Sequence, residues 1–337
     1  MEETNSDLVS ISERIMQVKG TMKKAGAFFF LLMLFEIPAA LLIYHVQGKF
    51  ASEYRTLISI LMTQGYLLLG AIIYILITKI HLREDLWMKK YKLSTFFLSL
   101  VVLLTASPMA GLLNLISQLF VKNTTSEAIF TVTERVPIWL GILIIGCLPG
   151  FIEETLYRGI IFSAFRKRSV LTGVVISSLC FGLMHMNFNQ ILYAIYLGVI
   201  FALLVEATGS LVSTMILHML FNAVNTAYVY ILPVLYEWLG RFSPEYADMD
   251  LESLFAQSPS TAELIPSIIT ITPLAIGGIA LTVLLLKAIA SINDRTFTWE
   301  YIRGDKKEVS ETNPITVFLV LGWLFCLVNA VFSAMAG

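Results

Sequence analysis

Three charged residues fall within one hydrophobic segment of the chain: Glu153, Glu154 and Arg158. An ionisable side chain in the hydrocarbon of a membrane is costly, roughly 2.5–3.5 kcal/mol for Asp, Lys or Arg on insertion scales, so each one needs compensation. Glu154 and Arg158 stand four residues apart, on one helical face, where they can pair. Glu153 points about 100° away. A buried ion-pair network accounts for Glu154 and Arg158 but gives no reason for Glu153, which has no cation to pair with nearby in the sequence. A buried carboxylate without a paired cation is suited to act as a general base.

Polar residues in two later segments fall at a similar depth. His185 ends one hydrophobic segment, and His218 and Asn222 form an i, i+4 pair in another. A single histidine or asparagine in a membrane most often serves helix–helix contact. Counted inward from the polar residues at the segment ends, however, Glu153, His185, His218 and Asn222 lie about 20, 25, 14 and 20 Å deep. We therefore predict one site near the middle of the membrane, built from three helices.

The dipeptide Pro149-Gly150 lies just before the two glutamates. Proline removes a backbone donor and clashes with the preceding helical turn. The pair therefore predicts a break or bend of the helix, with unpaired amides at the new N-terminus. Carboxylates three and four residues later are favoured near that positive helix end.

The composition defines the elements that must position these residues. Hydrophobic residues make up 57% of the 337 and charged residues only 14%, whereas soluble domains are about a quarter charged. Many apolar runs exceed the ~18 residues that span a bilayer. The sequence thus predicts an all-α, polytopic transmembrane helical bundle of about 8–9 spanning helices. We expect them near residues 26–46, 57–80, 94–120, 137–165, 170–186, 190–207, 210–232, 266–290 and 314–336.

Charge further limits the partners and sets the orientation. The net charge of −1 argues against a nucleic-acid partner, which would need a basic surface. The three cysteines fall inside hydrophobic segments and predict no disulfide framework. Most lysines and arginines fall on one side of the predicted spans, so we expect a multi-pass protein of the cell membrane whose N-terminus is cytoplasmic.

The predicted domain organisation has two parts. Residues 1–24 form a cytoplasmic N-terminal segment, read as an amphipathic surface helix or a solvated tail. Residues 25–337 form the transmembrane domain. Its outer loop, about 233–265, is acidic, which predicts either a solvated loop or a docking surface for a basic protein partner.

Other ionisable residues in hydrophobic segments are assigned structural roles. Glu36 lies beside Pro38 and has no evident partner in the sequence. Glu206 falls at a cytoplasmic helix end, where we expect an exposed carboxylate. His45 and His81 lie at segment ends.

Three motifs on successive hydrophobic segments resemble those of a known family. Glu153-Glu154-x-x-x-Arg158, Phe181-x-x-x-His185 and His218-x-x-x-Asn222 are similar to the signature motifs of the CPBP family. That family comprises type II CAAX prenyl proteases and bacteriocin-processing or immunity proteins, also called Abi proteins. The resemblance covers a protease-like core of about residues 135–230.

The resemblance implies peptide-bond hydrolysis inside the membrane, on a peptide or a lipidated or membrane-protein substrate. By analogy, Glu153 activates a water with help from His185. His218 and Asn222 stabilise the oxyanion, a role that their shared helical face also suits. Glu154 and Arg158 support the site.

Three alternatives stay open beside this hypothesis. In one, Zn²⁺ is held by Glu153, His185 and His218 with an open position for water, as in a metalloendopeptidase; a metal-free mechanism without any cofactor is preferred, since no HExxH pair is present. In another, the chain is a non-catalytic immunity or scaffold protein of the same family. A transporter or channel would also carry broken helices and carboxylates near the midplane, but it predicts related halves, and the Pro-Gly-x-x-Glu-Glu pattern occurs once.

Overall fold

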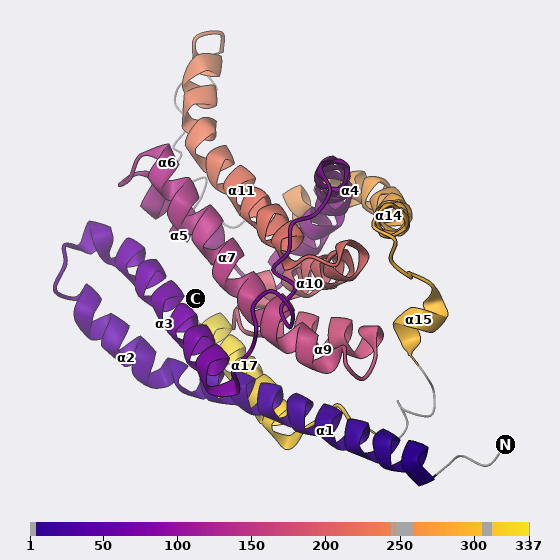
Figure 1. Cartoon of the computed structure of the whole chain (residues 1–337). Coiled ribbons are helices and arrows are strands. Elements are labelled where there is room, and N and C mark those ends of the chain that lie inside the picture. The colour runs from indigo at the N-terminus through magenta and orange to yellow at the C-terminus, as the bar shows by residue number, and fades with distance from the viewer. Residues whose placement is uncertain (1–4, 244–245, 247–258, 305–311, 337) are drawn as a thin grey trace.

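Figure 1 shows a computed structural model of the chain, in which the ordered elements are helices throughout the described residues, 5–243, 246, 259–304 and 312–336. The side chains of residues 5–11 and 336 are outside the description. The elements are, in chain order, α1 (Asn5–Leu34), α2 (Glu36–Gln47), η1 (Ser52–Tyr54), α3 (Arg55–Thr78), α4 (Leu93–Gln118), α5 (Thr124–Thr133), α6 (Ile138–Gly141), η2 (Ile142–Cys147), α7 (Leu148–Glu154), η3 (Thr155–Phe162), α8 (Ser163–Phe165), α9 (Val170–Leu183), α10 (Phe188–Thr208), α11 (Leu211–Gly240), α14 (Thr261–Ile292), α15 (Trp299–Arg303) and α17 (Val317–Ala336).

Eight helical segments of the described chain are long and apolar enough to cross a membrane, and α9 is a ninth, shorter apolar helix. This confirms the expected polytopic bundle of about 8–9 spanning helices, and the chain is a multi-pass membrane protein. The candidate spans are residues 12–47, 52–78, 93–118, 138–165, 188–208, 211–240, 261–292 and 317–335.

The helices at the two ends of the acidic outer loop are longer than expected. α11 continues to Gly240, and α14 starts at Thr261 behind a capping box formed by Ser260 and Glu263. The segment between the helices is therefore confined to residues 241–260. Most of its acidic residues lie outside the described part of the chain, so the predicted docking surface stays a prediction.

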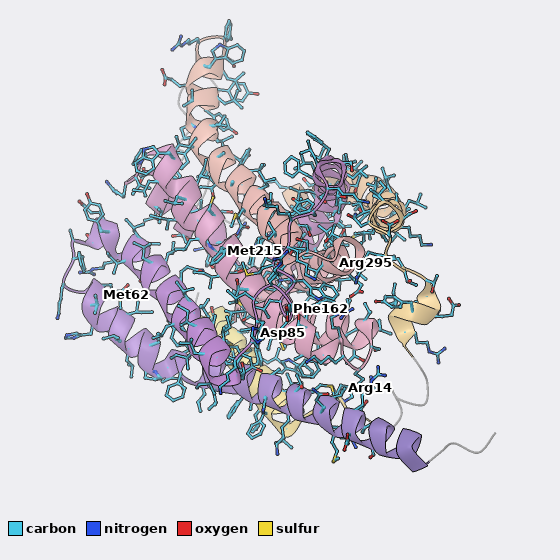
Figure 2. All side chains as sticks on the ribbon, in the orientation of Figure 1. Arg14, Met62, Asp85, Phe162, Met215 and Arg295 are labelled. Carbon is cyan, nitrogen blue, oxygen red and sulfur yellow. The ribbon has the colours of Figure 1, made fainter. Side chains whose placement is uncertain are left out.

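Pairs of helices enclose the span that carries Glu153. α4 packs along α14, α9 along α10, and α11 along the η2–α7 segment. α1 and α17 lie side by side (Figure 1). Figure 2 shows Met215 of α11 and Phe162 of η3 in the middle of the molecule, and both side chains are buried. The glutamate-bearing span and α10 are the two most deeply buried of the eight candidate spans.

Of the break or bend predicted at Pro149-Gly150, the break is wrong, because the chain stays helical from Ile138 to Phe165. Two π-helical segments, η2 and η3, flank the short α-helix α7. In a π-helix the backbone bonds run from i to i−5, so the wider turn before Pro149 accommodates a residue that cannot donate to i−4. The proline is absorbed by a change of helical pitch instead of ending the helix.

Gly150 serves close helix packing instead. A Cβ at Gly150 would lie 2.7 Å from the backbone nitrogen of Met219 on α11. One turn earlier, a Cβ at Gly146 would lie 3.1 Å from the backbone nitrogen of Ala223. Small residues four apart let two membrane helices approach each other closely. Continuing that face by four residues reaches Glu154, which is thereby brought against α11.

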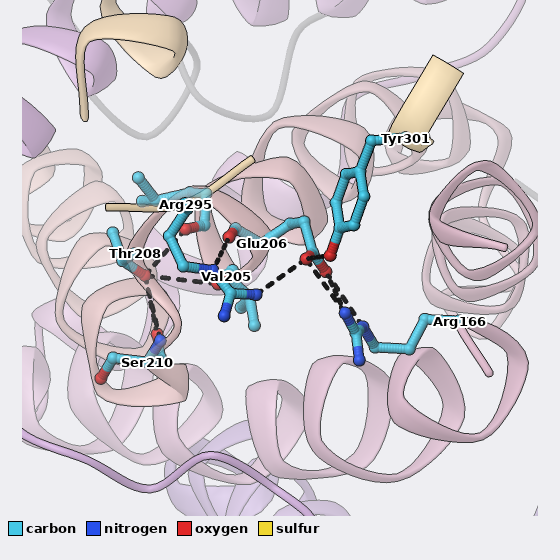
Figure 3. Close-up of polar contacts among 8 residues, drawn as sticks. Arg166, Val205, Glu206, Thr208, Ser210, Arg295 and Tyr301 are labelled. Carbon is cyan, nitrogen blue, oxygen red and sulfur yellow. Dashed lines mark hydrogen bonds and ion pairs between the residues drawn. The ribbon is translucent and has the colours of Figure 1, made fainter. Parts of the chain in front are cut away.

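The expectation of an exposed Glu206 is also wrong. Figure 3 shows its carboxylate held by Arg166, Arg295 and Tyr301, and the residue is 0% exposed. Arg166 donates from Nε and Nη2 at 2.9 and 3.0 Å, Arg295 donates from Nη2 at 2.9 Å, and the Tyr301 hydroxyl donates at 2.7 Å. Trp87 lies against both guanidinium groups, 4.2 Å from Arg166 Cζ and 4.9 Å from Arg295 Cζ. We call these five residues the Glu206 clasp. It joins the end of α10 to four other parts of the chain.

Candidate active site

Glu154 is the centre of the buried polar cluster. Its Oε1 accepts a hydrogen bond from Arg158 Nη1 at 2.9 Å and one from His218 Nδ1, also at 2.9 Å. Glu154 and Arg158 are both 0% exposed and His218 is 5% exposed. The i, i+4 pair predicted from the sequence therefore forms, and it also binds the histidine of α11.

Arg158 completes its environment with aromatic rings. Its guanidinium carbon lies 4.2 Å from the centre of the Phe181 ring and 5.3 Å from that of Phe201. Arg158 Nε and Nη2 have no hydrogen-bond partner among the described residues. The faces of aromatic rings attract a cation electrostatically, so the rings compensate part of the missing hydrogen bonding.

Glu153 faces the other side of His218. Its Oε2 lies 3.8 Å from His218 Nε2, and its Oε1 accepts a long hydrogen bond of 3.4 Å from Gln64 Nε2 on α3. The residue is 7% exposed and has no close cation comparable to the Arg158 of Glu154. A water molecule within about 2.8 Å of both Oε2 and Nε2 would sit beside the line that joins them. Glu153 is thus the less compensated carboxylate, as the spacing predicted.

His185 has a defined tautomer. Its Nδ1 lies 2.8 Å from the backbone carbonyl oxygen of Phe181, an acceptor, so Nδ1 carries the hydrogen and Nε2 of the neutral ring is free to accept a proton. The His185 ring packs edge-on against Phe181, whose ring also meets that of His218. The Phe181 ring thus connects His185 with His218, and His185 lies half-buried directly after the end of α9.

Asn222 lies one helical turn beyond His218 on α11 and is half-buried. Its backbone carbonyl accepts from Thr226, and its side-chain amide has no hydrogen-bond partner in the described part of the chain. The neighbouring Asn225 donates to the backbone of its own helix. Asn222 is thus the member of the predicted set that makes no direct contact with the cluster, and its amide is available to another group.

Two neighbours of the cluster were not predicted from the sequence. Gln64, 7% exposed, is a polar residue inside the predicted second span, and its position in an apolar segment could have identified it as a candidate. Phe201 shows no signal at all, because only the packing of α10 brings its ring toward Arg158 and to within 5.3 Å of the His218 ring.

The zinc alternative concerns Glu153, His185 and His218. Among the described residues these side chains do not form a ready-made group of three metal ligands. Nδ1 of His218 bonds to Glu154 and Nδ1 of His185 bonds to the Phe181 carbonyl, so Nε2 is the nitrogen of each ring that is left for another partner. Histidines that bind zinc commonly direct their second ring nitrogen to a carboxylate or a carbonyl, so these bonds suit a metal ligand as well as a proton-transfer group. Metal binding therefore stays a prediction beside the metal-free mechanism.

The arrangement of donors and acceptors indicates what the cluster can do. The His218 ring lies between the two carboxylates, with Nδ1 bonded to Glu154 and Nε2 on the side of Glu153. Glu153 and His185 then offer sites that take up protons, while His218 and Asn222 offer donors. Proton acceptors beside a pair of donors form an arrangement suited to general-base hydrolysis.

The comparison with known proteins agrees with this arrangement. The family model for Rce1-like type II CAAX prenyl endopeptidases matches residues 135–224. No curated protein and no solved structure gives a significant match. The matched stretch includes all six residues predicted for the site. Residues 135–224 are therefore similar to the Rce1-like type II CAAX prenyl endopeptidases, which confirms the resemblance predicted from the three motifs.

Proposed function

We propose that this protein is an intramembrane endopeptidase that cleaves a peptide or a membrane-associated protein with a water activated by Glu153 and His185. The proposal depends mainly on one observation: the two glutamates differ in how closely cations and hydrogen-bond donors surround them. Glu154 is neutralised by Arg158 and His218 at 2.9 Å, whereas Glu153 keeps a carboxylate oxygen 3.8 Å from His218 Nε2. A merely structural ion-pair network has no need of the second carboxylate.

The proposed reaction starts with proton transfer. Glu153 takes a proton from the water while the water oxygen attacks the carbonyl carbon of the scissile peptide, and Nε2 of His185 helps to hold or accept that proton. The carbonyl oxygen becomes an oxyanion, which His218 Nε2–H and the Asn222 amide stabilise. One such donor contributes on the order of 3–4 kcal/mol to the transition state.

The second half returns the proton to the leaving group. The tetrahedral intermediate breaks its C–N bond, and the proton held by Glu153 moves to the departing amine. Glu154 and Arg158 do not touch the substrate in this scheme. They hold the His218 ring in the orientation that points Nε2 at the oxyanion; because Nδ1–H already donates to Glu154, donation from Nε2 uses the doubly protonated ring. The mechanism uses no metal and no other cofactor.

The site's location follows from the same proposal. We place the protein in the cell membrane with its N-terminus in the cytoplasm, as the distribution of basic residues favours. The substrate then reaches Glu153, His185 and His218 within the bilayer, because the sequence places these residues near the middle of the membrane. A peptide or lipidated protein already partitioned into the membrane reaches it without crossing water.

The decisive experiment compares membrane peptides from cells that express the wild type, Glu153→Gln or Glu53→Gln. Glu53→Gln is the matched control, because it makes the same substitution at an exposed residue of η1. We expect peptides with new termini in the wild type and the control, and their loss with Glu153→Gln at unchanged protein level. Identical peptide sets in all three strains would contradict the proposal and favour a non-catalytic scaffold.

Metal independence needs its own measurement. Purified active protein should keep its full activity after dialysis against EDTA or phenanthroline. Loss of activity that added Zn²⁺ restores would contradict the metal-free mechanism and leave the endopeptidase reading in place.

A further inference from the structure

Glu36 is a carboxylate inside the membrane that the catalytic cluster does not use. It begins α2, directly after the interruption of the first membrane-spanning segment at Phe35, and it is half-buried. No hydrogen bond or ion pair is recorded between its side chain and any residue that the structure describes. A carboxylate at this depth is costly unless a partner compensates it, so an intramembrane ionisable residue without a partner indicates a functional site.

Glu36 lines a cavity of about 610 Å³ between α2, α3, α17 and the turn after α9. Cavities that bind ligands are mostly apolar with a few convergent polar groups. This one fits that description: Leu41, Ile43 and Phe325 contribute apolar surface. The polar groups around it are Glu36, Tyr44, Gln47, Thr63, Tyr66 and Asn329.

The cavity adjoins the catalytic cluster. Thr63 lines it and precedes Gln64, whose amide reaches Glu153, and Met186 lines it and follows His185. A molecule bound in this cavity therefore contacts the immediate chain neighbours of Gln64 and His185.

Glu36 and Glu153 also lie at matching depth. Glu36 is 12 residues after Lys24, and Glu153 is 13 residues before Arg166. At 1.5 Å per residue these are about 18 and about 20 Å of helix from the same face of the bundle. A substrate segment in the plane of the bilayer could contact both carboxylates at once.

The walls of the cavity come mainly from outside the matched family core. The family model covers residues 135–224, whereas α2, α3 and α17 lie before and after it, and Met186 is the one lining residue within the match. The shared core supplies the chemistry. The cavity is supplied by the part of the chain that the family model does not describe, and this is where we look for substrate selection.

We propose that the Glu36 cavity is a specificity subsite that binds the cationic side chain of a Lys or Arg residue near the scissile bond of the substrate. The inference rests on the proposed endopeptidase function and names its substrate class, a hydrophobic peptide segment with a basic residue. The alkyl stem of such a side chain would pack on the apolar wall while its cation meets Glu36. The pairing would neutralise the carboxylate, and the hydroxyl and amide groups around it would complete the hydrogen bonds.

The first test measures binding without cleavage. The inactive Glu153→Gln protein is mixed in detergent with short hydrophobic photo-cross-linking peptides that carry one Lys at successive positions, each paired with a norleucine version. Norleucine keeps the alkyl chain and removes the cation. We expect cross-linking to favour the Lys peptide at one or two positions by about tenfold, the worth of one good charge-assisted contact. Adding Glu36→Gln should abolish the preference, and adding Glu53→Gln should not.

The second test measures cleavage of the same peptides by the active protein. Glu36→Gln should lower kcat/KM for the preferred Lys peptide by about tenfold and leave that of its norleucine partner unchanged. An equal loss for both peptides, or a Lys preference that survives Glu36→Gln, would overturn the subsite.

The two tests separate this inference from the proposed function. A Glu36-dependent Lys preference in binding, with no cleavage of any peptide, would support the subsite and contradict the endopeptidase. Cleavage of the peptides without any Lys preference would support the endopeptidase and contradict the subsite.

Discussion

Glu154 accepts two hydrogen bonds through one oxygen, from Arg158 and His218, and this makes it the structural member of the glutamate pair. Replacing Glu154 by Gln would leave Arg158 as an uncompensated charge in a fully buried position. Breaking one partner of a buried pair costs about 3–5 kcal/mol, whereas replacing both by apolar groups is often close to neutral.

We therefore predict that Glu154→Gln lowers the melting temperature strongly and that the double variant Glu154→Gln, Arg158→Met recovers most of it. Thermal unfolding in detergent, followed by tryptophan fluorescence, measures both, with Glu153→Gln as the control expected to melt near the wild type. Additive losses in the double variant would show that the two side chains do not compensate each other.

The sequence could predict part of this cluster, for a physical reason. The Glu154–Arg158 pair depends on helical spacing alone, which is local. The bond from His218 to Glu154 depends on how α11 is rotated against α7, and nothing in the spacing of either segment gives that rotation. The buried Glu206 has the same origin, since its partners Arg166, Arg295 and Tyr301 come from distant parts of the chain.

The contact between α7 and α11 determines the geometry at the scale of elements. It depends on Gly146 and Gly150, because both positions face the backbone of α11. Adding a methyl group at Gly150 would push the helices apart and move His218 away from Glu154. Overpacking of this kind costs about 1–3 kcal/mol.

We predict that Gly150→Ala lowers the melting temperature and reduces cleavage. The matched control is Gly277→Ala on α14, where no atom lies within 4 Å of the new Cβ. That variant should be neutral or more stable by about 0.4–1 kcal/mol, because alanine restricts the unfolded chain. Equal behaviour of the two alanine variants would show that the α7–α11 contact is not tight.

Hydrophobic run length was enough to predict the spans, but not their continuity. The apolar runs gave the number of membrane helices, since crossing a bilayer needs a minimum length whatever the packing. The break predicted at Pro149 assumed an α-helix around the proline. A π-helical turn precedes it instead, and this turn relieves the steric clash and the lost hydrogen bond that proline causes in an α-helix. Such a change of pitch is favoured by tertiary packing and leaves no composition signal.

At the scale of the whole molecule, the Glu206 clasp connects residues 135–224, the stretch matched by the family model, to the helices that follow it. Arg166 directly follows the glutamate-bearing span, Glu206 lies in the last turn of α10, and Arg295 and Tyr301 follow α14. Backbone bonds strengthen the junction: Trp87 accepts from the amide of Leu211, and Arg295 Nε donates to the carbonyl oxygen of Glu206. The clasp thus fixes the ends of the helices that position Glu153 and His218.

Tyr301 makes the clasp sensitive to alkaline pH. Burial and the hydrogen bond to the Glu206 carboxylate raise the pKa of Tyr301 above its ordinary value of 10.0. A group whose pKa is raised by folding stabilises the folded state fully below its unfolded pKa, and this contribution is lost as the pH rises through the folded pKa. The stabilisation by Tyr301 is therefore present at neutral pH and declines above about pH 10.

We predict that Tyr301→Phe lowers the melting temperature of the purified protein at pH 8 and flattens its further decline above pH 10. The comparison isolates Tyr301, because the other tyrosines and the lysines titrate in both proteins. The wild type and the variant should converge at high pH, where ionised Tyr301 no longer donates to Glu206 and instead repels it. Parallel melting curves across the whole pH range would mean that the Tyr301 hydroxyl does not stabilise the clasp, and the junction would then depend on the two arginines alone.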